Sequence, residues 1–460
     1  MKKLELFIPV ENQVRELDAK LLLACLAVQR GFSVYLGWKG EMDQKIYLFR
    51  PGIYFAKSFA RQNQKMLRIL KGLGFMVIAW DEEGLVHYPP QVYHKLRFSA
   101  EVIPYIDHII AWGKDSAKLL SLHQPAMPVP IHIFGNPRGD LLRPELRDYF
   151  NEETLSLKKQ HGDFILVNTN FGTVNCFDPS LNICRPDDQS PDNLVLGRVG
   201  RNMPPEFAYL RYSERLRLLQ DFQVLLPRLA AQFPKYTIIL RPHPSENHNL
   251  WHDCVKDCGN VLVTTQGNVL PWILASTVMI HNGCTTAVEA ISMDQPAISY
   301  EPFQSMDETN YLPNSLSHRC STIDETIEAI QFYIVNPEQS LRKPGNAELL
   351  PDFLAAKDGA FACESLLNLV EKVEATSSMT SHSFRKRIST MFDAAIRHGS
   401  KSFKRLQGNP RYSRIFQDQR FPPLSIPDLQ NRITRFSQLL KFSRPIHIKP
   451  ITKTIVKLHQ

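Results

Sequence analysis

The chain has 460 residues, of which 43% are hydrophobic and 22% charged. That length exceeds one ordinary domain, and the composition excludes a chain that is disordered over most of its length. The longest aliphatic run, Leu21–Val28, is far shorter than the roughly 20 residues that a membrane-spanning helix needs. Glu5 interrupts the apolar stretch near the N-terminus, which argues against a signal peptide. We therefore expect a cytoplasmic protein.

The eight cysteines are scattered and contain no Cys-x-x-Cys pair. Cys254 and Cys258 follow His248 and His252 closely, which leaves a metal site open as an alternative. No second pair of ligands accompanies them, so free thiols in a reducing compartment are the favoured interpretation.

Short apolar runs alternate with helical patterns along the first 150 residues, and Gly31 is placed to end the first helix. This alternation predicts a parallel sheet with helices on both faces. The predicted strands are Leu4–Pro9, Ser33–Leu36, Lys45–Leu48, Phe75–Trp80, His108–Trp112 and Pro130–Phe134, and the predicted helices are Val14–Gln29, Ala60–Leu73 and Ser116–Leu122.

The same pattern restarts near residue 164. The segment Thr173–Arg211 is long and rich in Asn, Pro, Asp and Gly, as functional loops often are. We therefore expect an α/β fold of two Rossmann-like domains facing a cleft, at 1–150 and 151–375, and a basic tail at 376–460. The predicted strands are Phe164–Asn168, Tyr236–Leu240, Asn260–Thr264, Val278–His281 and Ala297–Tyr300, and the predicted helices are Glu214–Gln232 (broken or kinked at Pro227), Thr286–Ile291 and Asp352–Glu371.

Three acids, Asp81, Glu82 and Glu83, follow a predicted strand and precede Gly84. Ligands of open α/β sheets bind beyond the carboxyl ends of the strands, so a general base is expected there. Adjacent acids repel one another unless one is protonated or faces a cation, and a solvated turn is the alternative. Glu11, Arg15 and Glu16 follow the first strand, as binding residues or as structural ion pairs.

A second group of candidates is the run Arg241-Pro242-His243-Pro244-Ser245-Glu246 after another predicted strand. Two prolines restrict the backbone around His243. An imidazole fixed beside an arginine suits phosphate binding or protonation of a leaving phosphate. A structural histidine is the alternative.

A third group, His281–Ala290, combines a strand end, a glycine turn and a helix start. Thr285 or Thr286 is expected to cap that helix, whose N-terminal N–H groups form an anion site. Gly135–Asp140 and Asn168–Gly172 also follow strands. The phosphate loops GxGxxG and GxxxxGK[ST] are absent, which argues against a dehydrogenase or a P-loop kinase.

Together these motifs resemble the family of surface carbohydrate biosynthesis proteins, over roughly residues 5 to 300. More distantly, they are similar to bacterial polysialyltransferases, capsule transferases for the sugar Kdo and CDP-glycerol glycerophosphotransferases. The resemblance implies the two-Rossmann GT-B fold, a nucleotide-activated donor and no metal or other cofactor.

The resemblance also implies roles for individual residues. Glu83 or Glu82 would be the base, with Asp81 as a competing candidate, and His243 would contact the leaving nucleotide. Cys284 stands where the related motif often has serine. The implied nucleotide-sugar residues are Arg241, Pro244, Glu246, Asn282, Gly283, Thr285, Thr286, Asn170 and Arg138, and the acceptor-side residues are Glu11, Arg15 and Glu16.

The expected function is transfer of a sugar, such as a CMP-activated sialic-acid-like or Kdo-like acid, to a glycan or lipid-linked glycan of a bacterial surface polysaccharide. Two alternatives remain. One is a non-hydrolysing nucleotide-sugar epimerase, and the other is a catalytically degenerate adaptor for polysaccharide assembly or export.

Charge is distributed unevenly along the chain. Ser381–Gln460 holds 17 Lys and Arg against three acids, although the whole chain carries only +8. Eight aromatic residues accompany that charge, which argues against a disordered tail, and no nucleic-acid reader motif occurs. We expect peripheral attachment to the anionic inner face of the cytoplasmic membrane.

Overall fold

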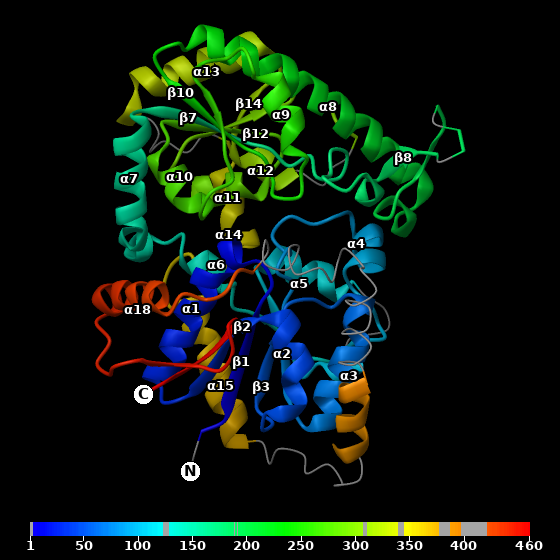
Figure 1. The fold of residues 1–460 in the computed structure, drawn as a ribbon, viewed down its shortest axis with the longest axis vertical. Helices are drawn as coiled ribbons and strands as arrows, with labels where there is room; N and C mark the ends of the chain where they lie inside the picture. The colour runs from blue at the N-terminus through cyan, green and yellow to red at the C-terminus, as the bar shows by residue number, and fades with distance from the viewer. Residues whose placement is uncertain are drawn as a thin grey trace. The chain divides into compact units, whose positions relative to one another are not determined.

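The computed structural model describes residues 3–122, 128–187, 189–190, 192–306, 311–338, 345–376, 387–396 and 421–460. The chain divides into two compact units (Figure 1). Unit 1 comprises Met1–Leu85, Arg97–Tyr149 and Pro351–Gln460, and unit 2 comprises Val86–Leu96 and Phe150–Leu350. The boundary expected at residue 150 is therefore close to one unit boundary. Residues 351–375, which we expected in the second domain, belong to unit 1.

Unit 1 contains a parallel sheet in the order β2-β1-β3-β4-β5-β6, with two antiparallel strands added at the β2 edge. Its switch point lies between β1 and β3, since the chain leaves β1 toward β2 on one side and continues from β3 on the other. The parallel strands are β1 (Glu5–Val10), β2 (Ser33–Trp38), β3 (Ile53–Ala56), β4 (Met76–Ala79), β5 (His108–Ala111) and β6 (Ile131–Ile133).

The third predicted strand, Lys45–Leu48, is wrong. Its residues end α2 (Lys39–Lys45) and form the 3-10 turn Ile46–Leu48, while the strand is β3. An apolar run this short fits a helical turn as well as a strand, and only Ile46 of the pair Ile46 and Leu48 is buried.

The helices of unit 1 follow the predicted pattern closely. Helix α1 (Gln13–Gln29) is followed by Gly31 at φ +86°, which confirms the expected glycine after its end. The predicted helix Asp352–Glu371 is two helices, α14 and α15. The other helices are α3 (Gln64–Leu73), α5 (Lys114–Ser121), α6 (Pro137–Asp140), α14 (Leu350–Phe353) and α15 (Ala362–Thr376).

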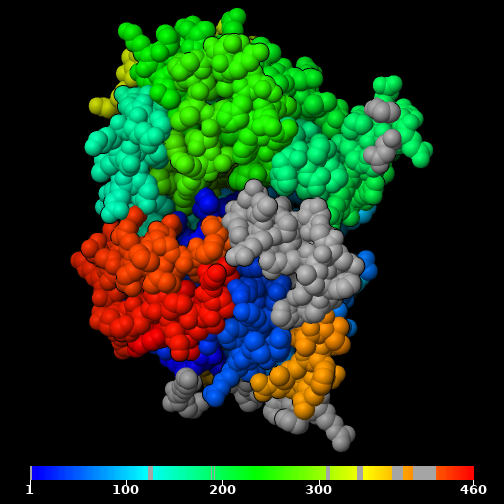
Figure 2. Space-filling model, in the orientation of Figure 1, coloured from blue at the N-terminus to red at the C-terminus, as the bar shows by residue number. Residues whose placement is uncertain are grey.

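Residues 421–460, expected as part of a separate tail, are built into unit 1. They form α18 (Ile426–Leu440), β15 (His447–Pro450) and β16 (Ile455–His459), and β16 pairs antiparallel with β2. Phe436 of α18 is fully buried and stacks on Tyr149 at 4.1 Å between ring centroids. In Figure 2 this red segment covers part of the surface of unit 1. The rest of the expected tail lies outside the described residues, except 387–396, which are helical.

Unit 2 has a six-stranded parallel sheet in the order β11-β10-β7-β12-β13-β14. Leaving out the small pair β8 and β9, this is the 3-2-1-4-5-6 order of dinucleotide-binding sheets, with its switch point between β7 and β12. The strands are β7 (Phe164–Asn168), β10 (Thr237–Arg241), β11 (Val261–Val263), β12 (Val278–His281), β13 (Ala297–Tyr300) and β14 (His318–Cys320), and all but β14 were predicted.

Helices cover both faces of this sheet. Ile165 and Val167 of β7 share one core with Phe222 of α8, Trp251 of α9 and Ile330 of α13. Alternate residues point to the opposite face. The helices of unit 2, of which α4 belongs to neither of these layers, are α4 (Pro90–Leu96), α7 (Asn151–His161), α8 (Pro205–Gln232), α9 (His248–Cys254), α10 (Val269–Ala275), α11 (Thr285–Ser292), α12 (Tyr311–Leu316) and α13 (Ile323–Val335).

Helix α8 runs through Pro227 as one element, so the proline does not split it. Proline has no N–H to donate to the carbonyl of Gln223, four residues earlier. The thiol of Cys254 takes that place, with Sγ 3.4 Å from the Gln223 oxygen. A side chain from α9 thus satisfies the carbonyl that Pro227 leaves open.

The long loop Thr173–Arg211 contains one small hairpin, β8 (Cys184–Pro186) paired antiparallel with β9 (Leu194–Leu196). Ile183, Cys184, Met203 and Ala208 form a small separate core beneath it. Across the described residues, no helix combines the length and apolarity that crossing a membrane requires.

Candidate functional site

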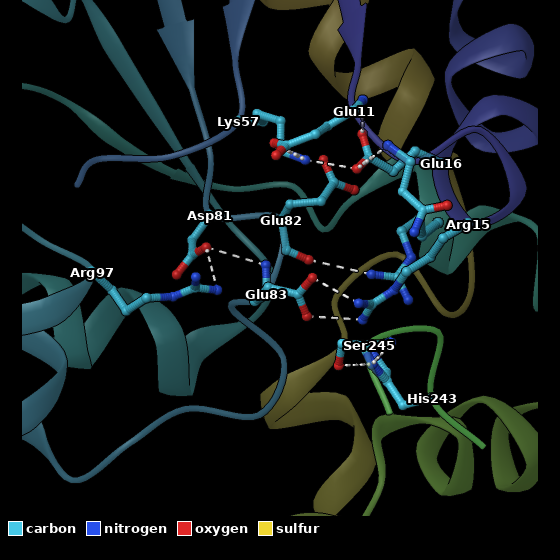
Figure 3. Close-up of polar contacts among 12 residues, drawn as sticks. Glu11, Arg15, Glu16, Lys57, Asp81, Glu82, Glu83, Arg97, His243 and Ser245 are labelled. Atoms are coloured by element: carbon cyan, nitrogen blue, oxygen red, sulfur yellow. Dashed lines mark hydrogen bonds and ion pairs between the residues drawn. The ribbon is translucent and has the colours of Figure 1, made fainter. Parts of the chain in front are cut away.

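The three acids after β4 differ in their surroundings, and Glu83 is the most accessible. Its carboxylate accepts hydrogen bonds from both Nη atoms of Arg15, at 2.7 and 2.8 Å (Figure 3). Its side chain is 39% exposed. Burial opposes its ionisation, but the charges of Arg15, Arg138 and Arg97 outweigh burial and lower its pKa to about 2. Glu83 is therefore an ionised carboxylate held by an arginine.

Glu82 and Asp81 are buried and serve the local structure. Glu82 accepts a hydrogen bond from Trp80 Nε1 at 3.0 Å and lies 3.2 Å from Lys20 Nζ. Asp81 accepts from the backbone N–H of Glu83 at 3.1 Å and pairs with Arg97 at 3.2 Å. These contacts hold the turn that presents Glu83.

The acceptor-side candidates also separate into buried and exposed residues. Glu16 is 3% exposed and pairs with Lys20 and Lys57, each at 2.6 Å. Burial opposes ionisation of Glu16, but the two lysines lower its pKa. Its carboxylate also accepts from the N–H groups of Glu11 and the next residue, so it fixes the loop after β1. Glu11 in that loop and Arg15 in the first turn of α1 have partly exposed side chains.

Lys57, after β3, forms a charged cluster with Glu11 and Glu16, and the sequence analysis did not identify it as a site residue. It lies 3.1 Å from Glu11 and 2.6 Å from Glu16. Burial opposes its charge, but these carboxylates raise its pKa. The cluster therefore gathers at the carboxyl ends of β1, β3 and β4, at the switch point of the sheet. The strand prediction placed Lys57 beyond the wrong segment, so its proximity to β1 was not visible.

Arg138 lies in unit 1, with the acids after β4. It donates to the backbone oxygen of Glu82 at 3.2 Å and its guanidinium lies 5.6 Å from the Trp112 ring centroid. Asp140, in the same motif, accepts from the N–H groups of Ala362 and Cys363 at 2.8 and 2.9 Å. It therefore fixes the start of α15. The contacts within unit 1 make Arg138 a partner of the acid turn, and the expected nucleotide contact stays a prediction.

In unit 2 the candidates collect where β7, β10 and β12 end. Asn168 of β7 stands in register with Arg241 of β10 on one side and His281 of β12 on the other. The loops that follow these three strands hold most of the nucleotide-sugar candidates. These strands were predicted from the sequence, and their order in the sheet brings the three motifs to one edge.

Glu246 connects two of these loops. It is 2% exposed and its carboxylate accepts from Thr169 Oγ1, from the N–H groups of Phe171 and His243, and from Trp251 Nε1, at 2.8–3.1 Å. Burial raises its pKa, although these four donors favour the ionised form. Glu246 therefore positions the His243 loop, and these contacts do not support direct contact with a ligand.

His243 itself is partly buried, and its neighbour Pro244 is exposed. Its Nδ1 lies 2.7 Å from Ser245 Oγ and accepts the backbone N–H of Ser245 at 3.2 Å (Figure 3). The proton of the neutral ring is then on Nε2, which makes that nitrogen the donor.

Arg241, which we expected to contact phosphate, is bound within its own unit. Its guanidinium donates to the backbone oxygens of Gln266 and Gly267 at 2.7 and 3.0 Å, and it lies 4.8 Å from the Trp272 ring centroid. Burial lowers its pKa to about 10. These contacts hold the loop before α10, because a buried guanidinium needs acceptors within reach.

The turn after β12 is fixed by His281. Burial lowers the pKa of this ring to about 3. Nδ1 accepts from Gly283 N–H at 3.0 Å and Nε2 lies 2.8 Å from Ser317 Oγ. Gly283 adopts φ +82°, which glycine tolerates without strain.

Asn282 and the start of α11 complete the site in unit 2. Asn282 Oδ1 accepts from Asn170 N–H at 3.0 Å, while its Nδ2 is buried without a hydrogen-bond partner. Thr286 Oγ1 is likewise buried without a partner. The N-cap of α11 is Cys284 and no side chain caps the helix, so the expected cap by Thr285 or Thr286 is wrong.

The alternative of a metal site finds no support in the part of the chain that the structure describes. Cys254 is engaged with Gln223, and no group of three or more His, Cys, Asp and Glu residues there is arranged to hold a metal ion.

The sequence matches no protein family model and no curated protein. Its fold matches solved structures of the wall teichoic acid polymerase TagF with TM-scores of 0.50, and of 0.51 for a single-residue variant. The identities are 11% and 10%, over 83% of this chain and 91% of those chains. The UDP-GlcNAc 2-epimerase of Methanocaldococcus jannaschii, in complex with UDP-GlcNAc and UDP, matches with a TM-score of 0.47 at 13% identity, over 80% of this chain and 99% of that one.

The TagF matches, together with the two sheets, define the fold class. The chain is an α/β protein of the GT-B type, with one parallel Rossmann-like sheet in each unit. At these identities the likeness concerns the fold.

Proposed function

We propose that the protein is a glycosyltransferase of bacterial surface polysaccharide biosynthesis that uses a nucleotide-activated sugar. The observation that carries the proposal is the edge of the unit 2 sheet. There the 3-2-1-4-5-6 strand order, the hydrogen-bonded His243 and the uncapped start of α11 occur together. Sheets of this order bind nucleotides at their switch point.

In this proposal unit 2 binds the donor through its phosphate. The N–H groups at the start of α11 attract an anion, and Gly283 forms the turn before them at φ +82°. The buried Nδ2 of Asn282 and the hydroxyl of Thr286 are donors that a phosphate would satisfy. His243 Nε2–H would donate to the departing phosphate, where preorganised donors stabilise developing charge. A CMP-activated sialic-acid-like or Kdo-like donor fits the sequence resemblance.

Unit 1 would supply the acceptor side, with Glu83 as the general base. A carboxylate whose pKa is about 2 is a weak base while Arg15 holds both of its oxygens. The proposal therefore requires Arg15 to leave Glu83 when the acceptor binds. An anionic group on the acceptor glycan that pairs with Arg15 would release Glu83 to take the proton of the attacking hydroxyl.

The test is binding and turnover by the purified full chain with CMP-sugars, UDP-sugars and CDP-glycerol. We expect one donor class to bind, and His243→Ala to lower turnover by roughly two orders of magnitude or more in the presence of an acceptor glycan. Conversion of a UDP-sugar without any acceptor would instead indicate an epimerase. Failure to bind any nucleotide, with polysaccharide production intact in cells that carry His243→Ala, would indicate an adaptor.

We propose further that unit 1 contacts the anionic inner face of the cytoplasmic membrane through the helix at 387–396. Phe392 and Ile396 are each 65% exposed on it, and Ile388 and Met391 are partly exposed on the same face. In the sequence, basic residues flank this helix on both sides. Apolar side chains between basic ones are typical of helices that lie in a membrane interface.

Vesicle sedimentation tests this contact. The full chain should sediment with vesicles that contain phosphatidylserine at low salt, and Phe392→Glu with Ile396→Glu should lower the bound fraction about tenfold or more. Phe332→Glu, an exposed aromatic residue of unit 2, is the matched control. Equal binding by both variants would refute the proposed contact. Truncation near residue 376 is unsuitable, because it also removes β16 and α18.

A further inference from the structure

Ser245 lies in the Arg241–Glu246 motif, but neither the sequence analysis nor the proposed function assigns it a role. Its hydroxyl and its backbone N–H both reach Nδ1 of His243, at 2.7 and 3.2 Å (Figure 3). A backbone N–H can only donate, so the lone pair of Nδ1 must accept it. The loop backbone is itself fixed, because His243 N–H donates to the buried carboxylate of Glu246 at 2.9 Å.

Gly172 provides the space for this contact. A Cβ at position 172 would stand 2.0 Å from Ser245 Oγ, 3.3 Å from Ser245 Cβ and 3.7 Å from His243 Nδ1. No φ in the left-handed region is recorded for this glycine, so its backbone does not require glycine. The absence of a side chain is what lets the serine hydroxyl lie against the ring.

We propose that Ser245 and Gly172 are positioning residues that fix the tautomer of His243, keeping its proton on Nε2. The inference deepens the proposed function, because an Nε2–H donor is what contact with an anionic leaving phosphate requires. With Nδ1 committed to Ser245, a neutral imidazole can donate only through Nε2. The ring is thus set as a hydrogen-bond donor before any ligand binds.

The test measures the tautomer directly, by nitrogen NMR of the full chain labelled with ¹⁵N-histidine. The chain has 15 histidines, so the His243 signals are assigned by their loss in His243→Gln. We expect the neutral ring to carry its proton on Nε2 in the wild type. Ser245→Ala keeps the backbone N–H at 3.2 Å but loses the hydroxyl at 2.7 Å, the closer of the two groups on Nδ1, so its fraction of the Nδ1–H form should rise above that of the wild type. A wild-type ring protonated on Nδ1, or equal tautomer fractions in both proteins, would overturn the inference.

Gly172→Ala provides an independent arm. The new methyl group must displace the serine hydroxyl, so this variant should reproduce the tautomer mixture of Ser245→Ala. The fraction of the Nδ1–H form in the double variant should be no larger than in either single variant, because both changes remove the hydrogen bond of the Ser245 hydroxyl. Gly259→Ala is the matched control, since nothing lies within 4 Å of a Cβ at that position. Additive effects of the two changes would contradict a shared mechanism.

Turnover then separates this inference from the proposed function. If the protein is a transferase, Ser245→Ala and Gly172→Ala should each lower kcat about tenfold or more, while the midpoint of thermal unfolding shifts little. If no nucleotide binds at all but the tautomer responds as described, the proposed function fails and the positioning of His243 stands.

Discussion

Arg15 and Glu83 are joined by two parallel hydrogen bonds, although 68 residues separate them in the sequence. The contact links the first turn of α1 to the turn after β4. Bidentate pairing restrains both side chains more than a single contact would. It sets the charge of Glu83, and it distinguishes Glu83 from the two acids beside it.

The first prediction is that Glu83→Gln mainly lowers turnover, whereas Glu82→Gln mainly lowers stability. Glu83→Gln should lower turnover at least about a hundredfold with unchanged donor affinity, because a base acts on the acceptor. Its stability should change by about 1 kcal/mol or less, since the ion pair is partly exposed. Glu82→Gln should cost about 3 kcal/mol of stability, because it breaks a buried contact with Lys20. Chemical unfolding and steady-state kinetics check both, and equal mild effects of the two changes would contradict distinct roles for these acids.

The second prediction concerns His243. His243→Ala should reduce turnover by roughly two orders of magnitude or more, through loss of a donor to the leaving group. The fold should persist because the side chain is only partly buried. His252→Ala, an exposed histidine on α9, is the matched control. Full activity of a well-folded His243→Ala protein would remove this residue from the mechanism.

The third prediction is that transfer proceeds in the presence of a chelator. The sequence has no Asp-x-Asp motif and no cluster of His and Cys that would hold a divalent ion. Turnover measured with EDTA should equal turnover without it. Loss of activity that magnesium or manganese restores would contradict this expectation.

The fourth prediction is a pH dependence of stability from His108 and His132. Nδ1 of His108 lies 3.1 Å from Nε2 of His132. Burial lowers the pKa of both rings, the charge of His132 lowers that of His108 and the charge of Lys372 lowers that of His132, while Asp107 acts in the opposite direction on His108. The folded state therefore binds fewer protons than the unfolded state. Stability from these rings should be complete above about pH 6.5 and fall as the pH drops below it.

The unfolding midpoint, measured between pH 7.5 and 5.5, tests this dependence. His132→Gln should flatten the curve over that range, because it removes one titrating ring and leaves a neutral partner for His108. An unchanged slope in this variant would show that other groups cause the acid sensitivity.

The fifth prediction is that residues 421–460 are required for a stable unit 1. Arg432 of α18 pairs with Asp18, and Tyr149 OH donates to Asp18 at 2.6 Å. Deleting 421–460 should therefore abolish cooperative unfolding of unit 1. Arg432→Met should lower stability by about 1 to 3 kcal/mol. Wild-type stability of the deletion variant would show that this segment is dispensable.

The sequence predicted the central architecture because buried parallel strands are continuous apolar runs. Phe164–Asn168, Val278–His281 and Ala297–Tyr300 were predicted with the bounds that the structure shows. In the sheet, β7 lies between β10 and β12, which places the three motif loops at one edge. Strand β14 was missed because His318–Cys320 is short and only Cys320 is buried.

Roles of individual side chains were harder to predict, because a motif specifies residue types but not which atoms meet. Arg241 and Glu246 have the chemistry of ligand-binding residues, yet both are buried against parts of their own unit. The sequence has no local signal for Gln266 as the partner of Arg241, since 25 residues separate them. The role of Ser245 was overlooked because its contact with His243 depends on the absence of a side chain at Gly172.

The C-terminal strands show how composition can mislead. Basic and aromatic residues in 421–460 led us to expect a tail that lies on the membrane surface. Ile455, Val456 and Leu458 are nevertheless buried in strand β16. The partner strand β2 lies more than 400 residues earlier in the chain. The charged residues next to the apolar ones also weakened the strand pattern of β16.

The position of β16 also determines the order in which the protein can be completed on the ribosome. All of unit 2 lies before residue 351, so its sheet can form while the last part of unit 1 is still being synthesised. Strand β2, made among the first forty residues, keeps an open edge until residues 455–459 emerge. An open edge can pair with another nascent chain. Rapid arrival of the last strand, or protection by a chaperone until then, would limit aggregation during synthesis.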